Sequence, residues 1–201
     1  MTQKKLSELA SQGNAGTHYP RTRMLTLAAL FACLLSIFSL VSIPIAGQVP
    51  LTLQVFAVLL STMILGPKVG TLANSIYLLL GAFGLPVFAG MTSGIPVLFG
   101  PNGGYLFGFV IGTFVGGLAC AKRSNSKKKD MLSLVLAAIL VLTVIYSLGV
   151  SWLAVELHLG MRDAILLGAV PFAPLDALKA AFAIQVALQV RWSRLPIPVH
   201  S

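Results

Sequence analysis

The chain has 201 residues, of which 57% are hydrophobic and 9% are charged, and its formal net charge is +9. This composition excludes an ordinary soluble domain, and apolar runs of helix length exclude an outer-membrane barrel. The length accommodates about six membrane-spanning helices. We therefore predict an all-α integral membrane protein, with one membrane domain at residues 23–192 between polar tails at 1–22 and 193–201.

The first predicted span covers residues 24–43 and carries Ala28 and Ala32, a small-residue spacing that favours close helix contact. Residues 44–52 follow, without charge and with prolines at positions 44 and 50. Proline breaks helices, so this segment is expected to be irregular. We interpret it as a lid over a site, with a plain turn as the alternative.

The second and third predicted spans cover residues 55–65 and 69–87, and the sequence Gly-Pro-Lys separates them. Asn74 and Tyr77 lie three residues apart in the third span, so both side chains can face inward. The alternative to a functional role is a structural one, in which Asn74 forms an interhelical hydrogen bond and Tyr77 is a core aromatic ring.

Residues 88–103 form an uncharged connection rich in glycine and proline, which is typical of a loop lining a cavity. The fourth span begins at Gly104, where glycines recur every four residues through Gly116. This spacing predicts a stripe against which another helix packs closely. Cys33 and Cys120 both lie in apolar runs and are expected to be small buried side chains without a disulfide.

A basic loop at residues 122–129 is expected to be solvated, and a fifth span is predicted at 131–152. After a connection at 153–163, a final apolar run covers 164–190, with a helix start expected near Leu175 because Pro171 and Pro174 precede it.

Asp176 and Lys179 are charged residues within this last run, and their spacing places them on one helix face. An ionisable side chain inside a membrane is costly and needs a partner or a function. The pair is either a structural ion pair or a site for a ligand that has hydrogen-bond donors and a negative group.

The distribution of basic residues predicts the orientation. With six spans, twelve Lys and Arg residues fall on one side and only Arg162 on the other, while Lys179 lies within a span. We expect the chain to lie in the bacterial plasma membrane. The positive-inside rule then places both of its termini in the cytoplasm. Nucleic-acid binding is not expected, because the basic residues are scattered over loop ends. Gln54, Tyr105, Asp176 and Lys179 are predicted to converge at the outer half of the bundle.

A series of motifs, in order along the chain, resembles the BioY family, the biotin-specific substrate-binding (S) components of energy-coupling-factor (ECF) transporters. These motifs occupy residues 49–54, 65–68, 77–81, 84–88, 100–109 and 176–179. The Gly-Pro-Asn-Gly-Gly-Tyr-Leu block beginning at Gly100, joined to Gly-Leu-Pro-Val-Phe, is the most specific of them.

The resemblance implies the six-helix S-component fold, which captures biotin from outside. It implies no enzymatic activity and no cofactor or metal, with biotin as the transported substrate. The implied partners are a transmembrane coupling protein and two ATPase subunits in the lipid bilayer. The resemblance also implies that the face carrying Ala28 and Ala32 docks the coupling protein.

Biotin offers a ureido ring, an apolar sulfur ring and a carboxylate. Asp176 can accept hydrogen bonds from the ureido N–H groups, and Lys179 can bind the carboxylate or the ureido carbonyl. The remaining predicted ligand contacts are Tyr105, Asn74, Gln54, Tyr77 and Thr92. Thr92 stands where family members often carry an arginine. Either Lys179 alone or Thr92 with Ser93 would then hold the carboxylate here, or the tail would be held more weakly.

Three alternatives remain open from the sequence. The chain could be a solitary, oligomeric biotin transporter that uses the glycine stripe as its oligomer interface and needs no ATPase. It could be an S component for another vitamin. It could also be an intramembrane enzyme that uses Asp176 and Lys179 as an acid–base pair, although no further catalytic group accompanies them.

Overall fold

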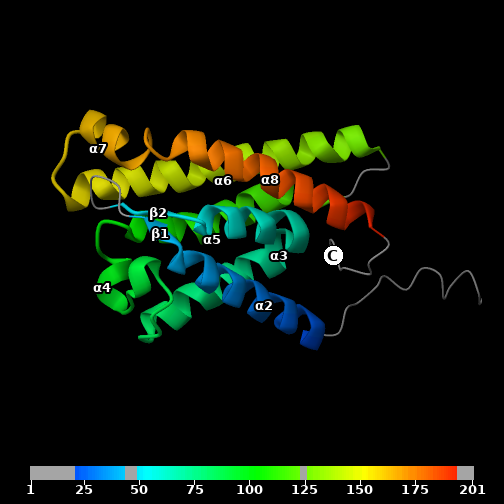
Figure 1. Ribbon diagram of the computed structural model, residues 1–201, viewed down its shortest axis with the longest axis horizontal. Coiled ribbons are helices and arrows are strands. Elements are labelled where there is room, and N and C mark those ends of the chain that lie inside the picture. Colours follow the sequence, from blue (N-terminus) through cyan, green and yellow to red (C-terminus); the bar gives the residue numbers. More distant parts are fainter. Residues whose placement is uncertain (1–20, 44–48, 123–125, 194–201) are drawn as a thin grey trace, which may run out of the picture.

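The computed structural model describes residues 21–43, 49–122 and 126–193 (Figure 1). Most of both predicted tails, residues 44–48 of the predicted lid and residues 123–125 of the basic loop lie outside these ranges. In chain order the elements are α2 (Arg21–Leu40), β1 (Ser42–Ile43), β2 (Leu51–Thr52), α3 (Gln54–Ala82), η1 (Ala89–Met91), α4 (Ile95–Leu98), α5 (Gly103–Ala119), α6 (Lys127–Glu156), α7 (Met161–Gly168) and α8 (Ala173–Trp192).

The long helices pack side by side as a bundle with two distinct ends (Figure 1). The short elements α4, α7 and the β1–β2 pair lie at one end, and α2 begins and α8 ends at the other. The two strands pair antiparallel, with Ser42 opposite Thr52. Residues 49–52 are therefore non-helical, as the prolines predict.

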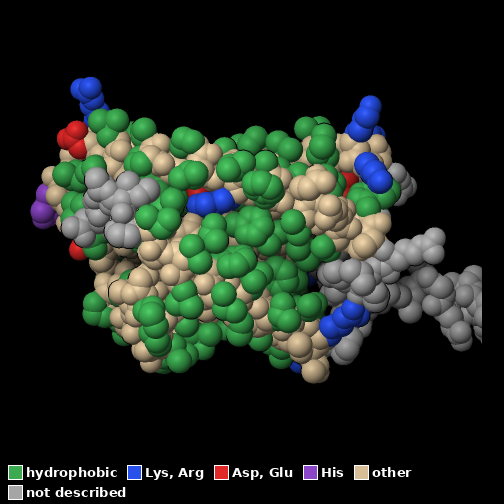
Figure 2. All heavy atoms as spheres, viewed as in Figure 1, with side chains coloured by type: hydrophobic (Ala, Val, Ile, Leu, Met, Phe, Trp, Pro, Cys, Tyr) green, Lys and Arg blue, Asp and Glu red, His purple; other side chains and the backbone are tan. Residues whose placement is uncertain are grey.

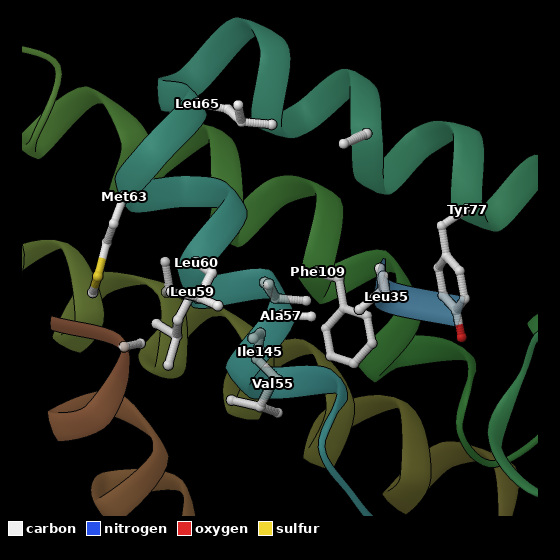
Figure 3. Close-up of a cluster of buried hydrophobic side chains, with 14 of the residues drawn as sticks. Leu35, Val55, Ala57, Leu59, Leu60, Met63, Leu65, Tyr77, Phe109 and Ile145 are labelled. Atoms are coloured by element: carbon white, nitrogen blue, oxygen red, sulfur yellow. The ribbon is translucent and has the colours of Figure 1, made fainter. Parts of the chain in front are cut away.

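Helix α3 consists of two limbs that fold back on each other (Figure 3). Gly66 has φ 74° and ψ −172°, a backbone conformation that glycine adopts readily, and Pro67 follows it. The limbs are antiparallel, because Gln54 bonds to Tyr77 and Asn74 bonds to Ser61 across them. The prediction of two spans separated at residues 66–68 is thus confirmed.

The described residues supply six membrane-crossing segments. Helices α2, α3, α6 and α8 are long and apolar enough to cross a membrane, and α5 is a shorter apolar helix. Since α3 contributes two limbs, the predicted count of six is confirmed.

Several boundaries differ from the predictions. The third span ends at Ala82 rather than at residue 87, and α6 extends at both ends beyond the predicted 131–152. Residues 127–129 are helical rather than part of a loop, because lysine is a good helix former and hydropathy detects only the apolar part of a helix. The final apolar run is interrupted, so its first residues form α7 and α8 begins at Ala173.

The glycine stripe packs α5 directly onto α6, as predicted. A Cβ atom added to Gly108 would lie 2.9 Å from the Ile145 Cα, and one added to Gly112 would lie 3.1 Å from the Val141 carbonyl oxygen. The two backbones therefore approach too closely for larger side chains. The stripe is buried within the chain, which argues against the alternative that it forms an oligomer interface.

Large apolar side chains cover the outside of the bundle. Leu132 is 68% exposed, Phe182 59% and Leu30 58%. Figure 2 shows hydrophobic side chains over much of one face. Basic side chains lie mainly toward the end where α2 begins and α8 ends, with others at the opposite end and in the middle of the face. An exposed apolar band of this kind is what a bilayer requires.

A buried ion pair joins four helices at the end of the bundle where α2 begins and α8 ends. Arg191 is 1% exposed and its Nη1 donates to Asp130 Oδ1 at 2.9 Å. The same guanidinium donates to the carbonyl oxygens of Met63 and Cys120, which lie near the ends of the first α3 limb and α5. Arg191 is one of the twelve basic residues expected on one side of the membrane. It lies in the last turn of α8, with its side chain turned into the bundle. Cys33 is exposed, contrary to prediction, whereas Cys120 is buried.

Candidate ligand-binding site

A cavity lies at the end of the bundle that carries the β1–β2 pair. Its wall is formed by the described part of the predicted lid, by the loop after α3, by helices α3, α4, α5, α6 and α8, and by the end of α7 with the segment that leads to α8. The lining residues are Val49, Pro50, Leu51, Thr52, Gln54, Val55, Phe88, Ala89, Thr92, Val97, Asn102, Tyr105, Leu106, Phe109, Ile145, Tyr146, Gly168, Phe172, Asp176 and Lys179.

Asp176 and Lys179 form the polar centre of this wall. Lys179 Nζ lies 2.7 Å from Asp176 Oδ1, and the side chains are 12% and 5% exposed. Tyr146 donates to the other carboxylate oxygen at 2.6 Å, and Lys179 also donates to the Thr52 carbonyl at 2.7 Å. Asp176 lies in the first turn of α8, where the helix dipole favours a negative charge.

The two interpretations of this pair are therefore compatible. The residues form an ion pair, and that pair lines a cavity. The contact with Thr52 also ties the beginning of α8 to strand β2, within the segment predicted to cover the site.

Gln54 is the polar side chain that α3 places in the cavity wall. Its Oε1 accepts from the Thr52 hydroxyl at 2.9 Å, and its Nε2 donates to the Tyr77 hydroxyl. Gln54 begins α3 immediately after β2, so this network fixes its amide beside the irregular segment.

Tyr105 provides an aromatic face to the cavity. Its hydroxyl donates to the Gly168 carbonyl at 2.9 Å, and its ring packs against Gly149. A Cβ at either glycine would overlap the tyrosine, so these small residues create the slot that holds it. Phe88, Phe109 and Phe172 complete a wall that is aromatic on several sides.

Thr92 lies at the cavity but is exposed. Its hydroxyl donates to the Ala89 carbonyl at 3.0 Å, within the turn formed by η1. Its short side chain places a hydroxyl, and no positive charge, in this part of the wall.

Asn74 and Tyr77 do not line the cavity. Asn74 is 1% exposed and donates to Ser61 at 3.0 Å and to Thr113 at 3.1 Å, which joins the α3 limbs to α5. Tyr77 is fully buried, bonds to Gln54 and meets the Phe88 ring edge to face. In this conformation they support the wall from behind, and direct ligand contact by either residue stays a prediction.

Ala28 and Ala32 are also buried, at 0% and 1% exposure. Within α2 they belong to the face turned into the chain's own core, so a partner would not reach them in this conformation. Their proposed role in docking stays a prediction.

Sequence reasoning missed Tyr146, Asn102 and Phe172. Tyr146 is the most informative of these, because it bonds directly to Asp176. The available signal was a tyrosine hydroxyl inside an otherwise apolar span, since such a group needs a partner when it is buried. Its partner lies thirty residues further along the chain, so spacing alone could not identify it.

The site as a whole combines apolar and aromatic surfaces with a few groups of both hydrogen-bonding types. It offers carboxylate and amide oxygens as acceptors, and an ammonium, an amide and hydroxyls as donors. This arrangement suits a small ligand with an apolar body, N–H donors and a negative group.

Comparison with known proteins identifies the family. A sequence model described as the BioY family matches residues 3–195. The biotin transporter BioY of Thermotoga maritima is 46% identical over 170 residues, which cover 84% of this chain and 96% of that protein. The probable biotin transporter BioY of Pyrococcus horikoshii is 42% identical over 167 residues, covering 83% and 95%.

The fold is also that of a solved transporter subunit. A crystal structure of the S-component for biotin from an ECF-type ABC transporter superposes with a TM-score of 0.79 at 25% identity. The alignment covers 89% of this chain and 96% of that one. The chain therefore belongs to the BioY family.

Proposed function

We propose that this chain is the biotin-binding membrane subunit of an ECF transporter, which captures biotin outside the cell for ATP-driven uptake. The observation that carries the proposal is the cavity where Asp176, Lys179 and Gln54 meet an aromatic wall. The relatives named as biotin transporters and the solved S-component for biotin support the choice of ligand.

Biotin complements this cavity group by group. Asp176 accepts from the ureido N–H groups, as Tyr146 holds its second oxygen in place. Tyr105 and the phenylalanines contact the sulfur ring. Lys179 binds either the carboxylate or the ureido carbonyl of biotin. To do so, it gives up its hydrogen bond to the Thr52 carbonyl or to Asp176. Hydrogen bonds that involve charged groups contribute about 1.5–3 kcal/mol each, so a few of them allow tight binding.

The proposed orientation places the cavity on the outside. Exposed Lys68, Lys122 and Lys127–Lys129 lie on the turns and helix ends opposite the cavity, as alternating spans require. By the positive-inside rule that end faces the cytoplasm. The cavity then opens toward the external solution, where a scarce vitamin must be captured.

Calorimetric titration of the purified chain tests the ligand. We expect saturable, high-affinity binding of one biotin per chain, and biotin as the ligand that co-purifies. A vitamin that lacks the ureido ring serves as the control and is expected not to bind. Tight binding of another vitamin without binding of biotin would replace the proposed ligand.

Uptake into proteoliposomes tests the coupling. We expect biotin to accumulate only when the chain is reconstituted with an ECF coupling protein and two ATPase subunits, and only with ATP. Docking through Ala28 and Ala32 would require α2 to move from its present position, because both residues are buried. Equal ATP-independent uptake by the chain alone would favour the solitary transporter.

A further inference from the structure

A second hollow lies at the end of the bundle opposite the candidate biotin site. It is a groove of about 300 Å³ between the beginning of α6 and the end of α8. Its lining residues are Lys127, Lys128, Met131, Gln185, Leu188, Gln189 and Trp192. None of them belongs to the biotin cavity.

The residues contributed by α8 recur at the spacing of one helix face, from Gln185 through Trp192. They present two amides, an apolar side chain and an indole to the groove. Lys127 of α6 crosses over the Trp192 ring, with Nζ 5.3 Å from its centroid. This contact brings a cation close to the apolar part of the groove.

The charge of the groove is not balanced by the acid beside it. Lys127 and Lys128 are exposed, and Asp130 follows them in the same helical turn. However, Asp130 is fully buried, and its two oxygens accept from Arg191 Nη1 and Trp192 Nε1. Its carboxylate is therefore directed into the bundle, so the lysines remain available to an external anion.

The groove also continues into the apolar surface of the bundle. Met131 in the groove is 47% exposed, and Leu132 and Leu136 follow on α6 at 68% and 49%. On α8, Phe182 and Val186 are exposed next to the groove residues. Tryptophan and lysine at the end of a span are typical of the membrane–water interface.

We propose that this groove binds an anionic phospholipid. Lys127 and Lys128 hold the phosphate, Gln185 and Gln189 hydrogen-bond the headgroup, and Met131 and Leu188 contact an acyl chain. A free phosphate would use only the charged part of the groove, whereas a phospholipid uses both parts. The proposed cytoplasmic orientation agrees with this ligand, because anionic lipids are enriched in the cytoplasmic leaflet. The proposal goes beyond biotin binding and does not depend on it.

Native mass spectrometry of the detergent-purified full chain tests the proposal, with phosphatidylglycerol and phosphatidylcholine as probes. We expect one phosphatidylglycerol to be retained, and phosphatidylcholine to be retained at least fivefold less. The double variant Lys127→Gln, Lys128→Gln is expected to lose at least fivefold of the phosphatidylglycerol retention. Lys129→Gln is the matched control, because Lys129 is exposed in the same helical turn but does not line the groove.

Three outcomes would overturn the proposal. They are equal retention of both lipids, unchanged retention by the double variant, or displacement of the lipid by millimolar inorganic phosphate, which would indicate a simple anion site. The thermal unfolding midpoint of each variant, measured without biotin, verifies folding independently of the proposed function.

Discussion

Replacement of Asp176 by asparagine is expected to weaken biotin binding roughly tenfold or more while the chain still folds. The substitution keeps the shape of the side chain and removes the charge that strengthens hydrogen bonds from the ureido N–H groups. Lys179 keeps its bond to the Thr52 carbonyl, so the beginning of α8 stays attached to β2. Lys179→Ala should have an effect of similar size, because it removes the only described cation that lines the cavity.

Isothermal titration of purified variants with biotin measures both effects. Asp163→Asn provides the matched control, since Asp163 is exposed on α7 at the same end of the bundle and does not line the cavity. Its affinity should equal that of the unmodified chain. Unchanged affinity in both the Asp176 and the Lys179 variants would show that the ligand binds elsewhere.

Replacement of Arg191 by methionine should destabilise the chain by about 3–5 kcal/mol. It leaves Asp130 fully buried without its ion-pair partner, and it removes the donors to the Met63 and Cys120 carbonyl groups. The double variant Asp130→Asn, Arg191→Met should recover part of this loss, because no unpaired charge then remains in the bundle.

Denaturant unfolding in detergent micelles measures the change in the free energy of unfolding. Arg162→Met is the matched control, because Arg162 is exposed on α7. A loss for Arg191→Met no greater than that for Arg162→Met would mean that the ion pair contributes little to stability.

The general plan of the bundle was predictable from the sequence because its signals are local. Apolar runs located the spans, and Gly66 with Pro67 marked the reversal of α3. The four-residue glycine repeat predicted a close helix contact, although not that α6 would be the partner. Helix ends were less predictable, because lysines and glutamate continue a helix beyond the apolar region that hydropathy detects.

The site was only partly predictable, because its contacts join residues that are distant in sequence. Asp176 and Lys179 could be paired from their spacing. The bond from Tyr146 to Asp176 could not be, and neither could the pairing of Asp130 with Arg191, since each joins different helices. Asn74 has the polar character of a ligand-binding residue, but it joins helices behind the cavity.

The close contact between α5 and α6 divides the cavity wall into two parts with different freedom to move. Backbone meets backbone along the glycine stripe, so neither helix can slide or rotate without collision, and the two helices move together. Tyr105 and Tyr146 belong to this rigid pair, whereas Gln54 and Lys179 belong to α3 and α8. We expect the aromatic part to act as a fixed template that selects ligands by shape. Entry and release would then depend on displacement of the polar part away from that template.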